Sequence, residues 1–204
     1  MPIKLHPGRL ISWLMIGWGT SLLLYVASNV AYLNGTQEAL TQQWDRTHAV
    51  IKQQAATATN SGAAPVLTFQ RPRLARGQAL AKILVPSIGW EGVVVEGSDS
   101  VILAGGPGHV NSTAYPGEND NVVISNHNSY SLAWSKARVG DPITLETSWG
   151  SFTYHITGFK IVDPNDGSVT ASTHRPTLTF ITCYPLWAGR FAPQRYVVLA
   201  DLSR

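Results

Sequence analysis

The chain has 204 residues and a mass of 22.1 kDa, which is the size of one domain, or of one domain with an appendage. Apolar residues make up 44% of it and charged residues 13%, a balance that excludes a disordered chain. The net charge of +3 divides into +5 over residues 1–80 and −2 over residues 81–204, so nucleic-acid binding by the C-terminal part is not expected. With a single cysteine, Cys183, the chain can form neither an internal disulfide nor a cysteine-cluster metal site.

An uncharged apolar run of 24 residues fills positions 10–33. As a helix that rises about 1.5 Å per residue, it is longer than the roughly 30 Å hydrocarbon core of a bilayer. Lys4 and Arg9 precede the run, so the positive-inside rule keeps residues 1–9 in the cytoplasm and sends the rest across the cytoplasmic (inner) membrane. The sequence therefore predicts a single-pass anchor. A cleaved signal peptide is the alternative, although its apolar region would usually be about 7–15 residues long.

Residues 34–77 are predicted to form a stalk helix and a linker. Leu40, Trp44 and Ile51 recur at helical spacing among charged residues, which indicates a short amphipathic helix after the anchor. Two interpretations of this helix are open: it leaves the membrane as a surface stalk, or it packs on the domain that follows. The small, uncharged residues 55–65 then have the composition of a linker.

From residue 78 to residue 204 the pattern changes to short β-branched runs separated by Gly, Pro, Asn and Asp. Only two short segments, 99–103 and 132–137, look helical. Seven or eight strands over this length predict an all-β domain, an antiparallel barrel or a sandwich. The expected strands are 80–86, 92–97, 121–125, 142–147, 151–163, 177–182 and 195–202.

Cys183 is the first candidate for chemistry. It follows the predicted strand 177–182 directly and precedes Tyr184-Pro185, where the proline interrupts the ladder of hydrogen bonds. A lone cysteine is usually a small buried hydrophobe, but a thiol at the end of a strand lies where loops open onto a surface. A thiolate nucleophile needs a proton-transfer partner and a group that stabilises the oxyanion.

Two of the six histidines are candidates for the proton-transfer partner. His127 follows the predicted strand 121–125 and lies among small polar residues, which is again a position at the end of a strand, beside a loop. His109 follows a glycine turn and is equally suited to bracing that loop through hydrogen bonds. From spacing alone, a histidine is more often structural than catalytic.

Two arginines compete for the place beside the thiol. Arg195 opens the last predicted strand. If that strand neighbours the one that Cys183 follows, the two residues meet at one end of the pair. Arg190 lies in the connection between these two strands and is the alternative. Either arginine could also be an ordinary surface residue.

These residues stand in a longer pattern, and from about Ile83 to Leu202 the chain resembles a bacterial sortase, most like the class D and Gram-negative-type groups. The histidine, nucleophile and arginine blocks occur in the family's order, which is more specific than any one block. In chain order the matching segments are Val85-Pro86-Ser87-Ile88-Gly89, Val95-Glu96-Gly97, Gly106-Pro107-Gly108-His109, Pro116-Gly117-Glu118, Asn121-Val122-Val123-Ile124, Gly140-Asp141-Pro142-Ile143, Thr179-Phe180-Ile181-Thr182-Cys183-Tyr184-Pro185 and Ala192-Pro193-Gln194-Arg195-Tyr196-Val197-Val198.

The chain departs from the family's pattern beside the histidine. Members usually have Ala-Gly-His-Arg there, whereas this chain has Ser125-Asn126-His127-Asn128, so asparagines replace both the glycine and the arginine. Phe180 stands where leucine is usual. Cys183, His127 and Arg195 are all present, so the resemblance implies an active enzyme.

The resemblance implies a sortase-like β-barrel at residues 78–204 and a membrane-anchored cysteine transpeptidase with an extracytoplasmic catalytic domain. Cys183 would attack a Thr–Gly-type bond in the C-terminal sorting signal of a secreted protein and form a thioacyl enzyme. An amine acceptor of the cell envelope would resolve this intermediate. His127 would be the general acid, and Arg195 would orient the substrate and stabilise the oxyanion.

Thr182, Asn128 and His109 are the expected supporting or substrate-binding residues. Cys183, His127 and Arg195 require no metal, although acid pairs in the 116–120 loop could bind Ca²⁺. No cofactor and no nucleic-acid partner are expected. Two other classes of function are open. One is another Cys/His envelope peptidase such as an L,D-transpeptidase, in which the two residues lie close in sequence, unlike His127 and Cys183 here. The other is a membrane-tethered binding module with a decayed site, which the altered neighbours of His127 favour.

Overall fold

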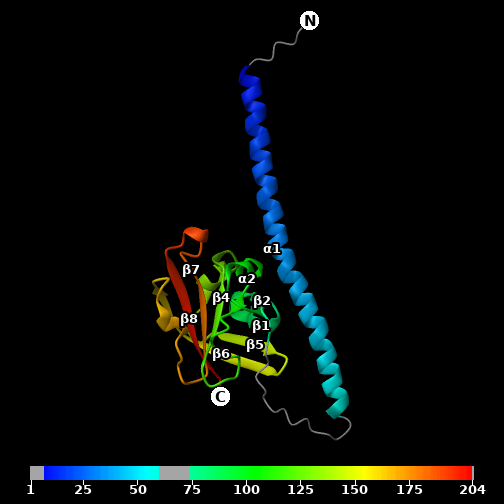
Figure 1. Cartoon of the computed structure of the whole chain (residues 1–204), viewed down its shortest axis with the longest axis vertical. Coiled ribbons are helices and arrows are strands. Elements are labelled where there is room, and N and C mark those ends of the chain that lie inside the picture. The colour runs from blue at the N-terminus through cyan, green and yellow to red at the C-terminus, as the bar shows by residue number, and fades with distance from the viewer. Residues whose placement is uncertain (1–6, 60–73, 204) are drawn as a thin grey trace. The chain divides into compact units, whose positions relative to one another are not determined.

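The computed structural model describes residues 7–59 and 74–203, and residues 60–65 of the predicted linker lie outside these ranges. The chain divides into two compact units, Met1–Thr36 and Gln37–Arg204. The first unit contains the N-terminal part of one helix. The second contains the C-terminal part of that helix and a closed β-barrel (Figure 1).

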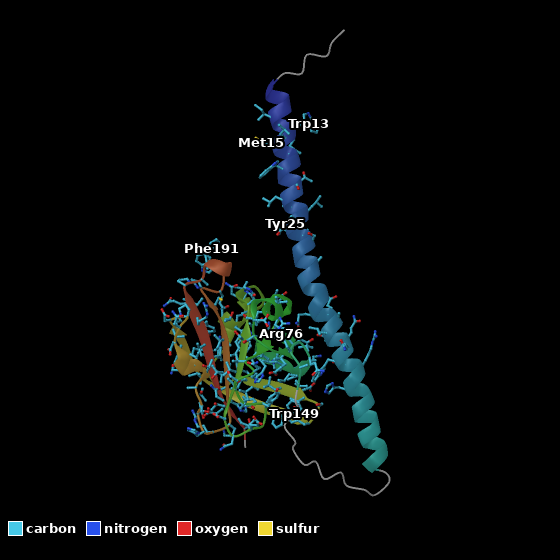
Figure 2. All side chains as sticks on the ribbon, in the orientation of Figure 1. Trp13, Met15, Tyr25, Arg76, Trp149 and Phe191 are labelled. Carbon is cyan, nitrogen blue, oxygen red and sulfur yellow. The ribbon has the colours of Figure 1, made fainter. Side chains whose placement is uncertain are left out.

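Helix α1 spans Pro7–Thr59 as one element, so the stalk helix expected after residue 34 is not separate from the N-terminal apolar helix. Residues 55–59, expected to belong to the linker, are also helical, because alanine is the best helix former. Gly35 does not interrupt α1, because one interior glycine costs a helix only about 1 kcal/mol. Within the first unit, Ile11–Ser28 has a mean hydropathy of 1.4 and exposed side chains, which suits a membrane-spanning segment. A signal sequence near an N-terminus would have the same properties. Figure 2 shows Trp13 and Tyr25 projecting from this part of the helix.

In the second unit, the C-terminal part of α1 contacts the barrel. The side-chain amide of Gln37 donates from Nε2 to the carbonyl oxygen of Gly105 at 2.6 Å and accepts from the backbone N–H of Val93 at 3.1 Å. Trp44 is buried, and the ring of His48 stacks on it at a centroid distance of 3.7 Å. Of the two interpretations of this segment, these contacts support packing on the domain.

Eight strands form the closed barrel, which confirms the predicted all-β barrel. They join in the order β1-β2-β3-β4-β7-β8-β6-β5, and Figure 1 shows β7 and β8 side by side. All except β3 match a predicted strand to within two residues at each end. The strands are β1 (Ala79–Val85), β2 (Trp90–Glu96), β3 (Gly108–His109), β4 (Asn121–Asn126), β5 (Pro142–Thr147), β6 (Gly150–Val162), β7 (Thr177–Tyr184) and β8 (Gln194–Leu202).

Short helices connect the strands. The expected helices at 99–103 and 132–137 correspond to α2 and η3. Asp99 begins the first of them, where its carboxylate accepts from the backbone N–H of Val101 and of Ile102. The α-helical turn is α2 (Ser100–Gly105), and the 3₁₀ helices are η1 (Pro86–Ile88), η2 (Asn128–Tyr130), η3 (Leu132–Lys136), η4 (Gly167–Thr170) and η5 (Gly189–Phe191).

The barrel is mixed, and not antiparallel throughout. β4 runs parallel to β7 along Asn121–Asn126 and Thr177–Thr182, and β2 runs parallel to the short β3. Two parallel neighbouring strands must be joined by a long crossover connection. Between β4 and β7, the β5–β6 hairpin and the connection 163–176 bring the chain back to the end of the barrel at which β4 starts. β4 and β7 therefore finish at the same edge of the barrel, and the residues that follow them come together.

Alternate residues of β4 and β7 fill the core. Ile124, Leu178 and Phe180 are buried inside the barrel. Trp134 of η3 stacks on Phe180 with ring centroids 3.9 Å apart and planes 12° apart. This packing fixes the η2–η3 segment, which follows His127, against the interior.

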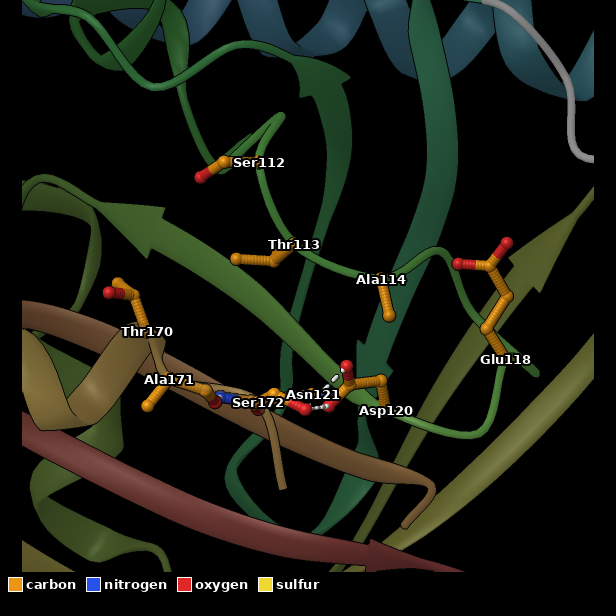
Figure 3. Close-up of a pocket in the computed structure, with 9 residues that line it drawn as sticks. All are labelled: Ser112, Thr113, Ala114, Glu118, Asp120, Asn121, Thr170, Ala171 and Ser172. Atoms are coloured by element: carbon orange, nitrogen blue, oxygen red, sulfur yellow. Dashed lines mark hydrogen bonds between the residues drawn. The ribbon is translucent and has the colours of Figure 1, made fainter. Parts of the chain in front are cut away.

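Asp120 fastens the β6–β7 connection to the start of β4. Its carboxylate accepts from Ser172 Oγ at 2.8 and 2.9 Å, and from the backbone N–H of Thr173 and of Asn121 at 2.8 Å each. These donors, Ser172 foremost, lower the pKa of Asp120 to about 2, so the carboxylate is charged at neutral pH. Asp120 and Ser172 line a cavity of about 230 Å³, in which Figure 3 shows them side by side.

Candidate active site

The register of three strands brings the predicted catalytic residues to one edge of the barrel. Cys183 of β7 is directly opposite Arg195 of β8 in the antiparallel ladder. On the other side of β7, Asn126 ends β4 beside Thr182, so His127 follows at the level of Cys183. The thiol, imidazole and guanidinium therefore start from adjacent backbone positions at the ends of three neighbouring strands.

Cys183 lies inside β7 and not after it, because the ladder with β8 continues to Tyr184. Successive side chains of a strand point to opposite faces. Phe180 and Thr182 point inward and are buried, whereas Cys183 is half-buried on the outer face. A substrate can reach a thiol in this position, unlike one in the core.

His127 follows β4 in an extended conformation, with φ −76° and ψ 142°, and precedes η2. Its side chain is half-buried. Within residues 7–59 and 74–203, no group forms a hydrogen bond with its imidazole. Both ring nitrogens are therefore available for proton exchange with a bound substrate.

The Arg195 guanidinium donates from Nη1 to the carbonyl oxygen of its neighbour Gln194 at 3.1 Å. It forms no ion pair with a carboxylate in the described part of the chain. A guanidinium carries five N–H donors, so most of them are available to a ligand. The competing Arg190 lies in η5, and its side chain is outside the described residues.

The three groups suit nucleophilic attack, proton transfer and oxyanion stabilisation. Residues 83–203, more than half of the chain, match the family model described as a sortase domain. The chain belongs to the sortase family. The resemblance inferred from the order of the sequence blocks is thereby confirmed.

Known relatives agree with this assignment. This sortase is 37% identical over 124 residues to Sortase D of Bacillus subtilis (strain 168); the match covers 60% of this chain and 63% of that protein, less than two thirds of its length. The Sortase D5 transpeptidase of Clostridium perfringens has a solved structure with a TM-score of 0.60 and 31% identity, covering 65% of this chain and 83% of that one. The Clostridium perfringens sortase C solved with the C-terminal cell wall sorting motif has a TM-score of 0.59 at 23% identity, covering 80% and 90%, and shows the fold alone.

Thr182 is buried beside Cys183, with 1% of its surface exposed. Its Oγ1 has no hydrogen-bond partner in the described part of the chain. An unpaired hydroxyl in the interior costs about 1–3 kcal/mol of stability.

We expect Thr182→Val, which puts a methyl group in place of the hydroxyl, to raise the melting temperature by about 2–4 °C for each kcal/mol gained. We expect turnover to change by much less than the tenfold that about 1.4 kcal/mol gives, because the hydroxyl points to the interior and the Cys183 thiol to the outer face. Calorimetry and a steady-state cleavage assay on one preparation measure both effects. A tenfold loss of turnover would mean that the hydroxyl does contact the reacting groups.

Asn128 ties the residue after His127 to the connection that follows Cys183. Its Nδ2 donates to the carbonyl oxygen of Gly189 at 3.0 Å, and its side chain is almost fully buried. Gly189 has φ 56°, in the left-handed region that glycine adopts without strain. In place of the family's usual arginine, this sortase has a short buried amide that joins two loops of the site.

His109 does not lie beside Cys183. It pairs with Ile124 of β4, three residues before His127, and its ring is fully buried. Its Nδ1 lies 2.9 Å from the carboxylate Oε2 of Glu96, and its Nε2 lies 2.9 Å from the carbonyl oxygen of Ala114. These contacts indicate that His109 braces the loop after β3. They do not support the alternative that it contacts the substrate.

No cluster of three or more His, Cys, Asp or Glu side chains among the described residues is placed to hold a metal ion. The acidic loop before β4 is where such an ion would be sought. There the Asp120 carboxylate is bonded to Ser172 and to backbone N–H groups, and Glu118 accepts from the backbone N–H of Tyr115 at 2.8 Å. Hydrogen bonds thus hold this loop in the structure.

Proposed function

We propose that this sortase is a membrane-anchored cysteine transpeptidase that cleaves the C-terminal sorting signal of secreted proteins at a Thr–Gly-type bond and joins them to an amine acceptor of the cell envelope. The observation that carries the proposal is the convergence of Cys183, His127 and Arg195 at one edge of the barrel. The 31% identical relative from Clostridium perfringens supports the proposal, because it is described as a Sortase D5 transpeptidase.

In the first half-reaction, the Cys183 thiolate attacks the carbonyl carbon of the scissile bond and forms a C–S bond. The carbonyl electron pair moves onto the oxygen, which accepts N–H donors from Arg195. As the C–N bond breaks, the His127 imidazolium gives its proton to the leaving amine. The products are a thioacyl enzyme and a peptide with a free amino terminus.

In the second half-reaction, the acceptor amine attacks the thioacyl carbon. His127, now neutral, takes the proton from the attacking nitrogen, and Arg195 again binds the oxyanion. The C–S bond breaks, the thiolate of Cys183 is restored, and the new amide bond leaves the site. One amide bond has been exchanged for another, so the sequence needs no oxidant or reductant.

Incubation of the purified full-length protein with a library of sorting-signal peptides tests this proposal. We expect cleavage at a Thr–Gly-type bond and a thioacyl adduct on Cys183 in mass spectra, which an added amine converts to an amide. A thiol that forms no adduct and resists alkylation at neutral pH would favour the binding module with a decayed site. Hydrolysis without transfer to any amine would favour another Cys/His envelope peptidase.

We further propose that residues 10–33 anchor the protein in the cytoplasmic membrane as a single pass. Residues 1–9 then lie in the cytoplasm, and the catalytic domain at residues 78–204 lies outside. The apolar, exposed Ile11–Ser28 stretch and the two basic residues before it support this topology.

Protease treatment of intact spheroplasts should digest or release the barrel, because it lies outside the membrane, while the full-length protein sediments with the membrane fraction before treatment. Immunoblotting with antibodies to the barrel detects both its digestion or release by the protease and the sedimentation of the full-length protein. A barrel that is protected until the spheroplasts are lysed would contradict the topology. A soluble form that lacks the apolar run would show a cleaved signal peptide instead of an anchor.

A further inference from the structure

Two buried side chains hold both backbone polar groups of His127. Its N–H donates to Oδ1 of Asn126 at 2.9 Å, and its carbonyl oxygen accepts from Oγ of Ser131 at 2.9 Å. Nδ2 of Asn126 donates to the same Ser131 Oγ at 3.1 Å, so the two side chains are also bonded to each other. The side chains of Asn126 and Ser131, closed into a ring through the His127 backbone, are called the His127 clamp below.

The clamp lies in the interior. Asn126 is 2% exposed and Ser131 is fully buried, and each of their side-chain polar atoms has a partner. The carbonyl oxygen of Ser131 accepts from the backbone N–H of Trp134, whose ring stacks on Phe180 in the core. The His127 carbonyl oxygen also accepts from the backbone N–H of Tyr130 at 3.1 Å, so it keeps one partner if the bond from Ser131 is lost. Removal of the Ser131 hydroxyl still leaves Nδ2 of Asn126 without this acceptor in the interior, at about 1–3 kcal/mol. The ring of hydrogen bonds therefore favours one conformation of the His127 backbone.

The geometry of the clamp matters because the imidazole has no hydrogen-bond partner of its own among the described residues. Its place is set by the His127 backbone and by side-chain torsions. The clamp fixes that backbone from both sides, and the bond from Asn128 to Gly189 holds the next residue against the connection after β7. A catalytic side chain must be held to within about 0.5 Å of its productive position.

We propose that Asn126 and Ser131 are positioning residues that hold His127 for proton transfer to the leaving amine. This inference rests on the proposed transpeptidase function. The glycine usual before the histidine in the family has no side chain, so it cannot bond the N–H of the next residue as Asn126 does. The clamp thus assigns a structural role to Asn126, which stands where the family usually has glycine. The sequence alone suggested no role for this departure.

The test compares two substrates that differ in their need for a general acid. One is a peptide with the scissile Thr–Gly amide, and the other is its thioester analogue, in which sulfur replaces the glycine nitrogen. A thiolate leaves without being protonated, whereas an amine does not. The ratio of the kcat/KM values for the two substrates covers only the steps up to the release of the first leaving group, because both substrates then give the same thioacyl enzyme. It therefore reports proton transfer to that leaving group and cancels changes in thiol ionisation.

In Ser131→Ala, full length and in detergent, we expect the amide-to-thioester ratio of kcat/KM to fall about 10- to 100-fold, as for a catalytic group displaced by about 1 Å. KM for the amide should be unchanged. Asn126→Ala should lower the ratio similarly, and the double variant should lose little more than the worse single variant, because the pair acts as one unit. If Ser131→Ala does not fold, Asn126→Ala alone decides.

Ser135→Ala is the matched control. Ser135 Oγ donates to the Leu132 carbonyl oxygen at 2.8 Å in the adjoining η3, but it is exposed and does not contact His127. We expect its ratio to equal that of the wild type. A clamp variant that folds and keeps the wild-type ratio would overturn the inference, as would equal losses on both substrates.

His127→Gln separates this inference from the function on which it rests. We expect it to lower the amide-to-thioester ratio at least as far as the clamp variants do. If His127→Gln leaves the ratio unchanged, the proposed general acid is wrong. If His127→Gln lowers the ratio and neither clamp variant does, the function stands and the clamp does not.

Discussion

Cys183→Ala is expected to abolish cleavage of the sorting peptide, by about 10⁴-fold or more, because the loss of a nucleophile removes the covalent path entirely. The fold should be retained. Cys183 is half-buried at the end of β7, and its backbone partner Arg195 remains in the ladder, so little packing is lost. A peptide cleavage assay and a melting curve of the same sample measure the two effects.

Cys183→Ser is the matched control for this change, because it keeps the size of the side chain while replacing the thiolate with a far weaker nucleophile at neutral pH. It should melt like the wild type and be almost as inactive as the alanine variant. Unfolding of both variants, together with a wild-type protein that never forms a thioacyl adduct, would mean that Cys183 is a structural residue.

Most of the barrel could be predicted from the sequence because its strands are long enough to show a pattern. β5 and β6 alternate or are rich in β-branched residues, and Gly and Pro mark their ends. β3 has only the two residues Gly108–His109, which leave no pattern. The parallel pairing of β4 with β7 also could not be predicted, because it depends on which strands a crossover brings together and not on local composition. The division expected between residues 33 and 34, where the apolar run ends, is absent because the helix continues through the polar residues that follow.

For the site, the candidate residues could be predicted from their positions at the ends of strands. Their roles could be predicted only from the resemblance to the family. Cys183, His127 and Arg195 were found in this way, and the register places them together. Ser131 was not singled out, because one serine in a polar segment carries no signal. Its importance comes from the turn η2, which brings its hydroxyl back to the residue that follows β4. Hydrogen bonds to backbone groups depend on the fold, so residue types alone do not reveal them.

Arg195→Lys is expected to lower turnover by about 10²–10³-fold, the typical effect of losing one preorganised oxyanion donor. A guanidinium is planar and offers two parallel N–H donors in fixed geometry, which a lysine ammonium cannot reproduce. The backbone of Arg195 is paired with Cys183 on one side and with Val162 of β6 on the other, so its side chain starts from a rigid position. Thermal stability should hardly change, because this guanidinium has no carboxylate partner in the described part of the chain.

Arg190→Lys is the control that decides which arginine acts. Arg190 follows Gly189 in η5, within the connection between β7 and β8, and a loop places a group less accurately than a strand does. We expect this variant to lose less than about tenfold in turnover, under roughly 1.4 kcal/mol of transition-state stabilisation. Steady-state cleavage assays on both lysine variants, at saturating peptide and at one pH, give the comparison. A larger loss at Arg190 than at Arg195 would mean that the loop, and not the β8 ladder, supplies the oxyanion donor, and that Arg195 is held beside Cys183 for another reason.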